Sequence, residues 1–182
     1  MIVGGTGHRL SKYSLPHDVP HASGYDEQNP LRLWIQACAE QHIRELRPLY
    51  VISGLAIGFD QDLAEVCVRI GQPFIAAVPF IGQEKKWPWR SQQRYRQLLK
   101  LAYEVIVTSP GGYSRDAMLI RNCFMVDHSN AMLAAFDGTT GGTAHTVHYA
   151  HRVNCDVIRI NPSDFREQLQ RGAHGRQVQS RA

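Results

Sequence analysis

Cysteine is scarce in this chain of 182 residues, which has only Cys38, Cys67, Cys123 and Cys155. The four lie far apart, so the close cysteine pairs typical of zinc sites are absent. Most of them stand inside apolar patterns, where a thiol behaves as a small hydrophobic side chain. We therefore expect reduced, largely buried cysteines, no bound metal and no cofactor.

Long hydrophobic runs are also missing. A membrane-spanning helix needs roughly 18 or more apolar residues, whereas the longest runs here have five or six. The first residues, MIVGGTGHR, lack the charged lead and apolar stretch of a secretory signal. These absences predict a cytoplasmic protein without a membrane partner.

Two familiar phosphate-binding motifs do not occur. No Walker lysine-plus-hydroxyl motif is present, and no G-x-G-x-x-G opens a helix directly after a strand. The first absence argues against ATP or GTP hydrolysis by the Walker route, and the second removes the dinucleotide fingerprint. The net charge of +4 and pI of about 9.0 are too mild to require nucleic acid, but they suit an anionic ligand of any size.

The apolar pattern that is present alternates between strands and helices. Buried, β-branched runs predict six strands, at 1–3, 49–53, 74–78, 104–109, 131–138 and 156–160. Helical spacing predicts helices between them, at 29–47, 60–70, 88–102, 114–129 and 143–153. Strands that are apolar on both faces and separated by helices indicate a mainly parallel, doubly wound α/β sheet with helices on both faces. We expect one domain over 1–162 and a polar, basic, flexible tail over 163–182.

Four of the predicted strands end in unusual residues. Glycines follow the first strand at 4, 5 and 7, the second at 54 and 58, and the fifth at 138, 141 and 142, and the third strand ends in Pro79 and Gln83. The carboxyl ends of parallel strands meet at one edge, where ligands of open α/β sheets bind. Glycine lets backbone N–H groups approach an anion, and a helix starting there adds positive potential. Together these turns favour a cradle for a phosphate or nucleotide over simple strand-to-helix turns.

Five segments in this order carry a family resemblance: GTGHR, SGLAIGFDQ, PFIGQEKKW, RNCFMVDHSNAMLAAFDG and GGT. Together they resemble the SLOG superfamily in its YpsA-like branch, which includes small phage members. The resemblance covers about residues 2–160 and implies a Rossmann-like fold. It also implies a nucleotide-derived ligand and self-association into a homo-oligomer. The superfamily includes LOG phosphoribohydrolases and DprA DNA-processing proteins, so it also admits single-stranded nucleic acid as a partner.

Carried over position by position, the resemblance implies a set of ligand-binding residues. They are Gly5, Thr6, Gly7, His8, Arg9, Ser53, Gly54, Gly58, Asp60, Gln61, Pro79, Gln83, Trp87, Arg121, Asn122, Asp127, Gly141, Gly142 and Thr143. One departure concerns catalysis. LOG enzymes carry a P-G-G-x-G-T-x-x-E motif with a catalytic glutamate, and Thr146 occupies that position here.

Several of these residues also have an ordinary structural explanation. Asp60 stands after a glycine turn, where it suits an N-cap as well as a ribose hydroxyl. Asp127 is expected in the middle of a helix, either exposed or paired across the site. The three histidines His145, His148 and His151 favour a polar helix face over a metal site. The segment 87–100 mixes aromatic and basic residues, and an ordinary amphipathic helix with Trp87 as a lid is favoured over a DNA-stacking surface.

Three functions follow, in order of preference. The first is binding of a nucleotide or an ADP-ribose-like ligand at the strand ends, as a sensor or sequestering protein. The second is cleavage of a nucleotide N-glycosidic bond, with Asp60, Asp127 or Asp137 as the catalytic carboxylate. The third is DprA-like binding of single-stranded DNA.

Overall fold

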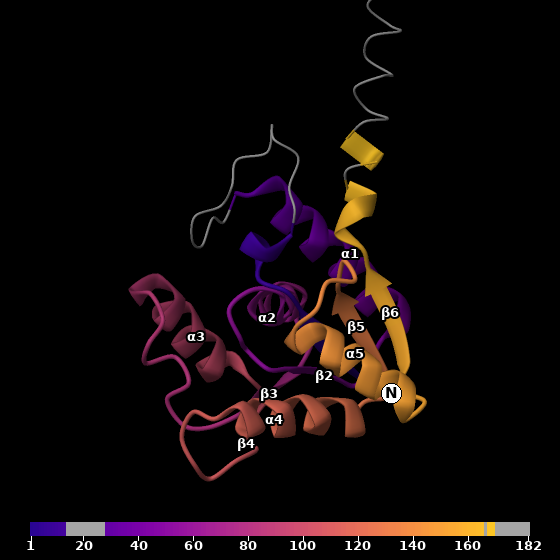
Figure 1. Ribbon diagram of the computed structural model, residues 1–182. Helices are drawn as coiled ribbons and strands as arrows, with labels where there is room; N and C mark the ends of the chain where they lie inside the picture. The colour runs from indigo at the N-terminus through magenta and orange to yellow at the C-terminus, as the bar shows by residue number, and fades with distance from the viewer. Residues whose placement is uncertain (14–27, 166, 170–182) are drawn as a thin grey trace, which may run out of the picture.

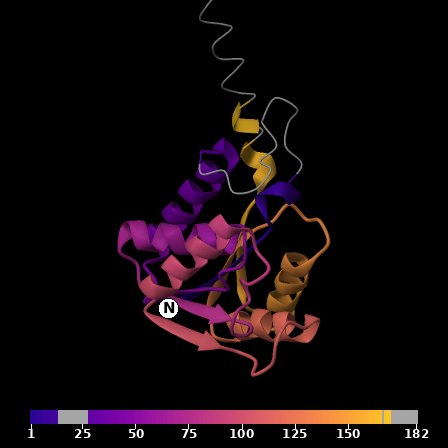
Figure 2. The same cartoon turned by 90° about the vertical axis from the view of Figure 1, so that its left-hand side faces the viewer.

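Six parallel strands form one sheet in the computed structural model, which describes residues 1–13, 28–165 and 167–169 (Figures 1 and 2). The strands are β1 Ile2–Gly7, β2 Tyr50–Ser53, β3 Phe74–Val78, β4 Glu104–Val107, β5 Ala131–Ala135 and β6 Asp156–Ile160. The helices are α1 Pro30–Leu46, α2 Phe59–Ile70, α3 Trp89–Leu101, α4 Arg115–Asp127 and α5 Gly142–Arg152, with a short 3₁₀ turn η1 at Leu10–Lys12. The predicted doubly wound, Rossmann-like α/β fold is confirmed.

The strand order β4-β3-β2-β1-β5-β6 places a switch point between β1 and β5. The chain first builds outward from β1 to β4 and then returns to pair β5 with the other side of β1, with Gly5 opposite Leu133. Connections on the two sides of this point run in opposite directions, which opens a crevice at the carboxyl ends of β1 and β5. The fold therefore fixes where a ligand site is expected.

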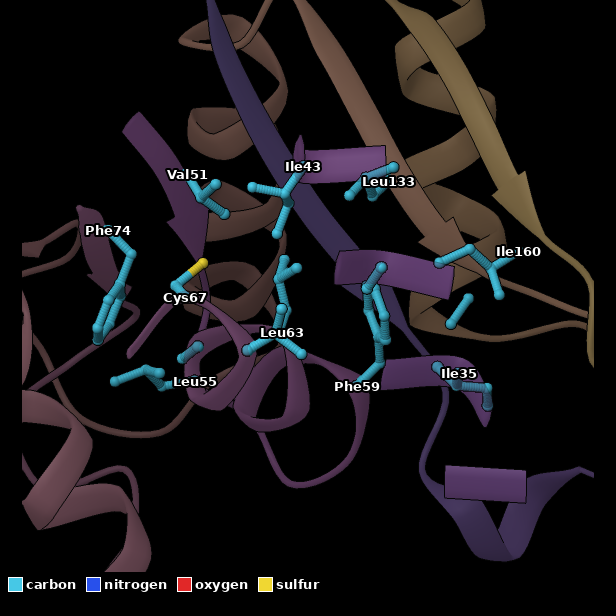
Figure 3. Close-up of a cluster of buried hydrophobic side chains, with 14 of the residues drawn as sticks. Ile35, Ile43, Val51, Leu55, Phe59, Leu63, Cys67, Phe74, Leu133 and Ile160 are labelled. Atoms are coloured by element: carbon cyan, nitrogen blue, oxygen red, sulfur yellow. The ribbon is translucent and has the colours of Figure 1, made fainter. Parts of the chain in front are cut away.

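Helices cover the two faces of the sheet as separate layers. On one face, Ile43 of α1 and Leu63 of α2 belong to the main core cluster with the strand residues Val51 and Leu133 (Figure 3). On the other face, Met125 of α4 packs with residues of β2 and β3, and a second cluster joins α4, β5 and α5. Burial of such side chains contributes about 1.5–3 kcal/mol each, so the sheet is fixed from both sides.

The start of α1 follows the sequence prediction. The Asn29 side chain accepts hydrogen bonds from the amides of Leu31 and Arg32, as expected of an N-cap. Leu33 and Ala37 of this helix are exposed, although they recur at helical spacing with the buried Ile43. Arg32 is buried instead, and it donates to Asp62 of α2 at 2.7 Å.

Packing continues beyond residue 162. Residues 162–165 are helical, and Phe165 is buried with its ring 5.7 Å from that of Trp34 on α1. The tail predicted from 163 therefore starts with packed residues, while residues 14–27, 166 and 170–182 lie outside the described part of the chain. No helix in the described ranges is long and apolar enough to cross a membrane.

Candidate functional site

The glycines near the N-terminus lie inside β1 and not in a turn after it. The strand was predicted to end at Val3, but it extends to Gly7. A Cβ on Gly5 would come within 2.1 Å of Leu63, and one on Gly7 within 2.4 Å of Phe59. These glycines allow α2 to pack closely on β1, and the turn predicted at this point was wrong, because the residues are still in the strand.

The turn from β2 to α2 is held by its own side chains. The Ser53 hydroxyl donates to the carbonyl of Asp60 at 2.6 Å, and the Gln61 amide donates to the carbonyl of Leu55 at 3.2 Å. Gly58 has φ of +112°, and a Cβ there would lie 2.7 Å from the His8 carbonyl. Ser53, Gly58 and Gln61 thus shape the loop, and none of them lines the cleft described below.

Asp60 is not an N-cap, because Gly58 occupies that position and Asp60 lies in the first turn of α2. Its carboxylate instead accepts a hydrogen bond from Nη1 of Arg121 on α4 at 3.2 Å. Both side chains are buried, at 5% and 4% exposure. This pair links the two helix layers across the sheet edge.

Gly54 makes room for that pair. A Cβ at this position would lie 1.5 Å from Nη1 of Arg121 and 2.7 Å from Oδ2 of Asp60. Burial raises the pKa of Asp60 to about 6, although the Arg121 charge opposes the shift. Burial also lowers the pKa of Arg121, against the stabilising charge of Asp60. Nε of Arg121 has no hydrogen-bond partner among the described residues.

The start of α5 is an uncapped helix N-terminus. Gly141 is its N-cap, with φ of +141°, and no side chain caps the helix. The amides of Gly142, Thr143 and Ala144 have no acceptor within the described ranges. Such free N–H groups carry partial positive charge and bind anions. Thr146, at the position of the LOG glutamate, is buried and donates to the Gly142 carbonyl at 2.9 Å.

His8 follows β1 and lies between the cleft and the loop after β5. Its Nε2 is 3.1 Å from the Thr139 hydroxyl and 3.4 Å from Oδ1 of Asp137. Burial lowers the pKa of His8, and the nearby Lys12 charge adds to the shift. The Thr139 hydroxyl also donates to Asp137 at 2.7 Å, so this candidate carboxylate orients His8 and does not line the cleft.

These elements surround a cleft of about 830 Å³ at the switch point. Ten of the nineteen predicted ligand residues line it: Thr6, Gly7, His8, Arg9, Asp60, Arg121, Asn122, Gly141, Gly142 and Thr143. Four lysine and arginine residues line the cleft, namely Arg9, Lys12, Arg115 and Arg121, and its lining contains one carboxylate, that of Asp60. Arg9 and Arg115 are exposed and pair with no other described residue. The cleft therefore suits an anion.

Several cleft residues were not predicted. Among them are Tyr113, Arg115, Met118 and Leu119, which come from the loop after β4 and the first turns of α4. A signal for them was present, since SPGGYSR follows the fourth strand and contains two glycines. The same strand-end argument that found the other turns would have found this one.

Other predicted contacts lie outside the cleft. Asp127 is the last residue of α4; it is exposed and accepts a hydrogen bond from the Tyr149 hydroxyl at 2.8 Å. Gln83 is buried and donates to the Gly54 carbonyl at 3.4 Å. The Trp87 ring packs on Tyr95, 5.4 Å away, which makes it part of the core boundary and not a lid. Pro79 is buried at the end of β3.

The basic helix α3 is less basic at its surface than its sequence implied. Arg94 is buried and donates to Asp62 at 2.7 Å, and Tyr95 is buried in the core. Arg96 pairs with Glu84 at 3.4 Å. Trp89, Arg90 and Lys100 remain exposed, so the amphipathic-helix interpretation agrees with this packing.

Comparison with solved structures shows the same fold. DNA processing protein A (DprA) of Streptococcus pneumoniae aligns with a TM-score of 0.60 and 17% identity, over 86% of this chain and 49% of that one. This chain thus spans about half the length of pneumococcal DprA. DprA of Helicobacter pylori, solved for its single-stranded DNA binding mode, aligns with a TM-score of 0.59 and 13% identity. The alignment covers 94% of this chain and 73% of that one. A molybdenum cofactor binding protein of Rippkaea orientalis aligns with a TM-score of 0.54 and 17% identity, over 92% of this chain and 83% of that one.

Sequence relatives give the family. The uncharacterized SPbeta prophage-derived protein YoqJ of Bacillus subtilis strain 168 is 32% identical over 165 residues, covering 78% of this chain and 95% of YoqJ. A UPF0398 protein of Shouchella clausii strain KSM-K16 is 25% identical over 150 residues, covering 79% of this chain and 75% of that protein. The YpsA family model, described as the YspA SLOG family, matches residues 25–162. Because that match covers more than half of the sequence, the chain belongs to the YspA SLOG family.

Proposed function

We propose that this protein binds an anionic, nucleotide-derived ligand in the cleft at the β1/β5 switch point. The observation that carries the proposal is the uncapped N-terminus of α5, which opens onto a cleft with four cationic side chains and one carboxylate. The free amides of Gly142 and Thr143 would bind a phosphate group, because an anion there meets both N–H donors and the helix dipole. Arg9 and Arg115 would neutralise its remaining charge.

A thermal-shift screen tests the proposal with AMP, GMP, ADP-ribose, NAD and a short single-stranded oligonucleotide. A ligand at about 100 times its Kd adds about 2.7 kcal/mol, which raises the Tm of a chain this size by about 5–10 °C. We expect a shift with one class of nucleotide. No shift with any small ligand, but a shift with the oligonucleotide, would favour DprA-like DNA binding instead.

The same cleft supports bond cleavage as a second candidate. Asp60 lines the cleft, and its pKa of about 6 suits a group that gives up a proton near neutral pH. In this role Asp60 would give its proton to the leaving base while water adds to the anomeric carbon of the sugar, so the N-glycosidic bond breaks, a carbon–oxygen bond forms, and the proton released by the water restores Asp60. Chromatography of the screened nucleotides after incubation decides between the two, since free base appears only if the glycosidic bond breaks.

Neutralising the two exposed arginines should weaken binding without unfolding the protein. We expect the double variant Arg9→Gln and Arg115→Gln to lose about tenfold or more in affinity for AMP, since a hydrogen bond to a charged group contributes about 1.5–3 kcal/mol. Isothermal titration measures the loss. Arg90→Gln is the matched control, because Arg90 is also exposed but lies on α3 outside the cleft. Equal affinity in the double variant and the control would contradict the proposed site.

A further inference from the structure

The cleft has an apolar part as well as a cationic one. Tyr113, Met118 and Leu119 all line it, and they come from the same short segment at the start of α4. Arg121 lies further along this helix, six residues after Arg115, and a helix rises about 1.5 Å per residue, so the two are about 9 Å apart along the axis. The wall formed by α4 thus offers apolar surface near its start and a buried guanidinium further along.

Tyr113 lines the cleft, yet most of its side chain is exposed to solvent. It is 79% exposed and stands directly after Gly111 and Gly112 in the loop between β4 and α4. Its ring meets that of Phe80 at an interplanar angle of 82° with the centroids 6.1 Å apart, and Phe80 itself is buried. This contact supports the tyrosine from one direction only, so most of the ring stays open to a planar partner.

We propose that Tyr113 is a base-stacking subsite, so that the ligand is a nucleotide with an aromatic base and not a sugar phosphate or inorganic phosphate. The inference rests on the proposed function, because the phosphate must first be held at α5. An aromatic side chain stacks on any nucleobase, since every base has a π-face. Met118 and Leu119 add apolar surface that a sugar phosphate would leave uncovered.

Isothermal titration of AMP, UMP and ribose 5-phosphate into the wild type, Tyr113→Ala and Tyr113→Phe tests this subsite. We expect the wild type to bind both nucleotides more tightly than ribose 5-phosphate. Tyr113→Ala should lose about 10- to 100-fold in nucleotide affinity, the range that stacking on one side chain supplies. Its affinity for ribose 5-phosphate should be unchanged, and Tyr113→Phe should bind as the wild type does. Tyr103→Ala is the control, because Tyr103 is 66% exposed but lies outside the cleft.

The outcomes separate this inference from the proposed function. Unchanged nucleotide affinity in Tyr113→Ala, or an equal loss for nucleotides and ribose 5-phosphate, would overturn the stacking subsite. So would a wild type that binds ribose 5-phosphate as tightly as AMP, although the anion site would then stand. A wild type that binds none of the three ligands would overturn the proposed function and this inference with it.

Discussion

Replacing Arg121 with methionine is expected to lower the free energy of unfolding by about 3–5 kcal/mol, the usual cost of removing one partner from a buried ion pair. The variant would leave Asp60 buried without its cationic partner, 3.2 Å from where Nη1 now lies. Because an ionised Asp60 would then be uncompensated, the loss should grow as pH rises. Urea denaturation at pH 5, 7 and 8 measures it.

The double variant Asp60→Asn with Arg121→Met is the control for this experiment. It removes both charges, so it should lose less stability than Arg121→Met alone. An Arg121→Met protein that unfolds at the wild-type urea midpoint at pH 8 would contradict the pairing. So would a double variant whose loss equals the sum of the two single losses.

The ionisation of Asp60 is expected to cost stability as pH rises. Burial raises its pKa in the folded protein to about 6 from an ordinary value of 3.8. Between these values the folded state holds a proton that the unfolded state has released, so the free energy of unfolding falls as pH increases through this window. A difference of about two pKa units corresponds to about 3 kcal/mol, reached in full above pH 6.

Asp60→Asn isolates this contribution because asparagine does not titrate. Urea denaturation of both proteins at pH 4, 5, 6 and 7 should show the stability of the variant rising relative to the wild type by about 2 kcal/mol over the series, since part of the effect is already present at pH 4. Any constant effect of the amide on Arg121 shifts every point equally and leaves the slope intact. A difference that does not change with pH would show that the Asp60 pKa is not raised.

Much of the fold was predictable because its signals are local. Six apolar runs separated by helical spacing predicted the doubly wound sheet, and helical spacing predicted a first helix at 29–47, close to the observed α1. The buried face of that helix also includes the polar residues Arg32 and Gln36, which contact Asp62 on α2. A pattern of apolar residues alone does not show which polar side chains turn inward to form such contacts.

The candidate site was predictable in its position but not in the role of each residue. Glycine serves equally in a phosphate turn and in a strand under a close-packed helix, and only the neighbours distinguish them. Gly5 and Gly7 proved to be packing glycines against Leu63 and Phe59, whereas Gly142 has open space where its Cβ would lie. The Asp60–Arg121 pair joins residues 61 positions apart, and only the folded chain brings them together.

Gly142→Ala tests the central claim most directly, because it adds one methyl group at the proposed phosphate site and changes no charge. A Cβ there meets no atom within 4 Å, and alanine is the better helix former, so the variant should be at least as stable as the wild type. Isothermal titration with AMP should then show about tenfold or greater loss of affinity, since the methyl keeps the phosphate from the free amides that otherwise contribute charge-assisted hydrogen bonds. A stable Gly142→Ala protein that binds AMP as tightly as the wild type would contradict the account of the α5 N-terminus as the anion site.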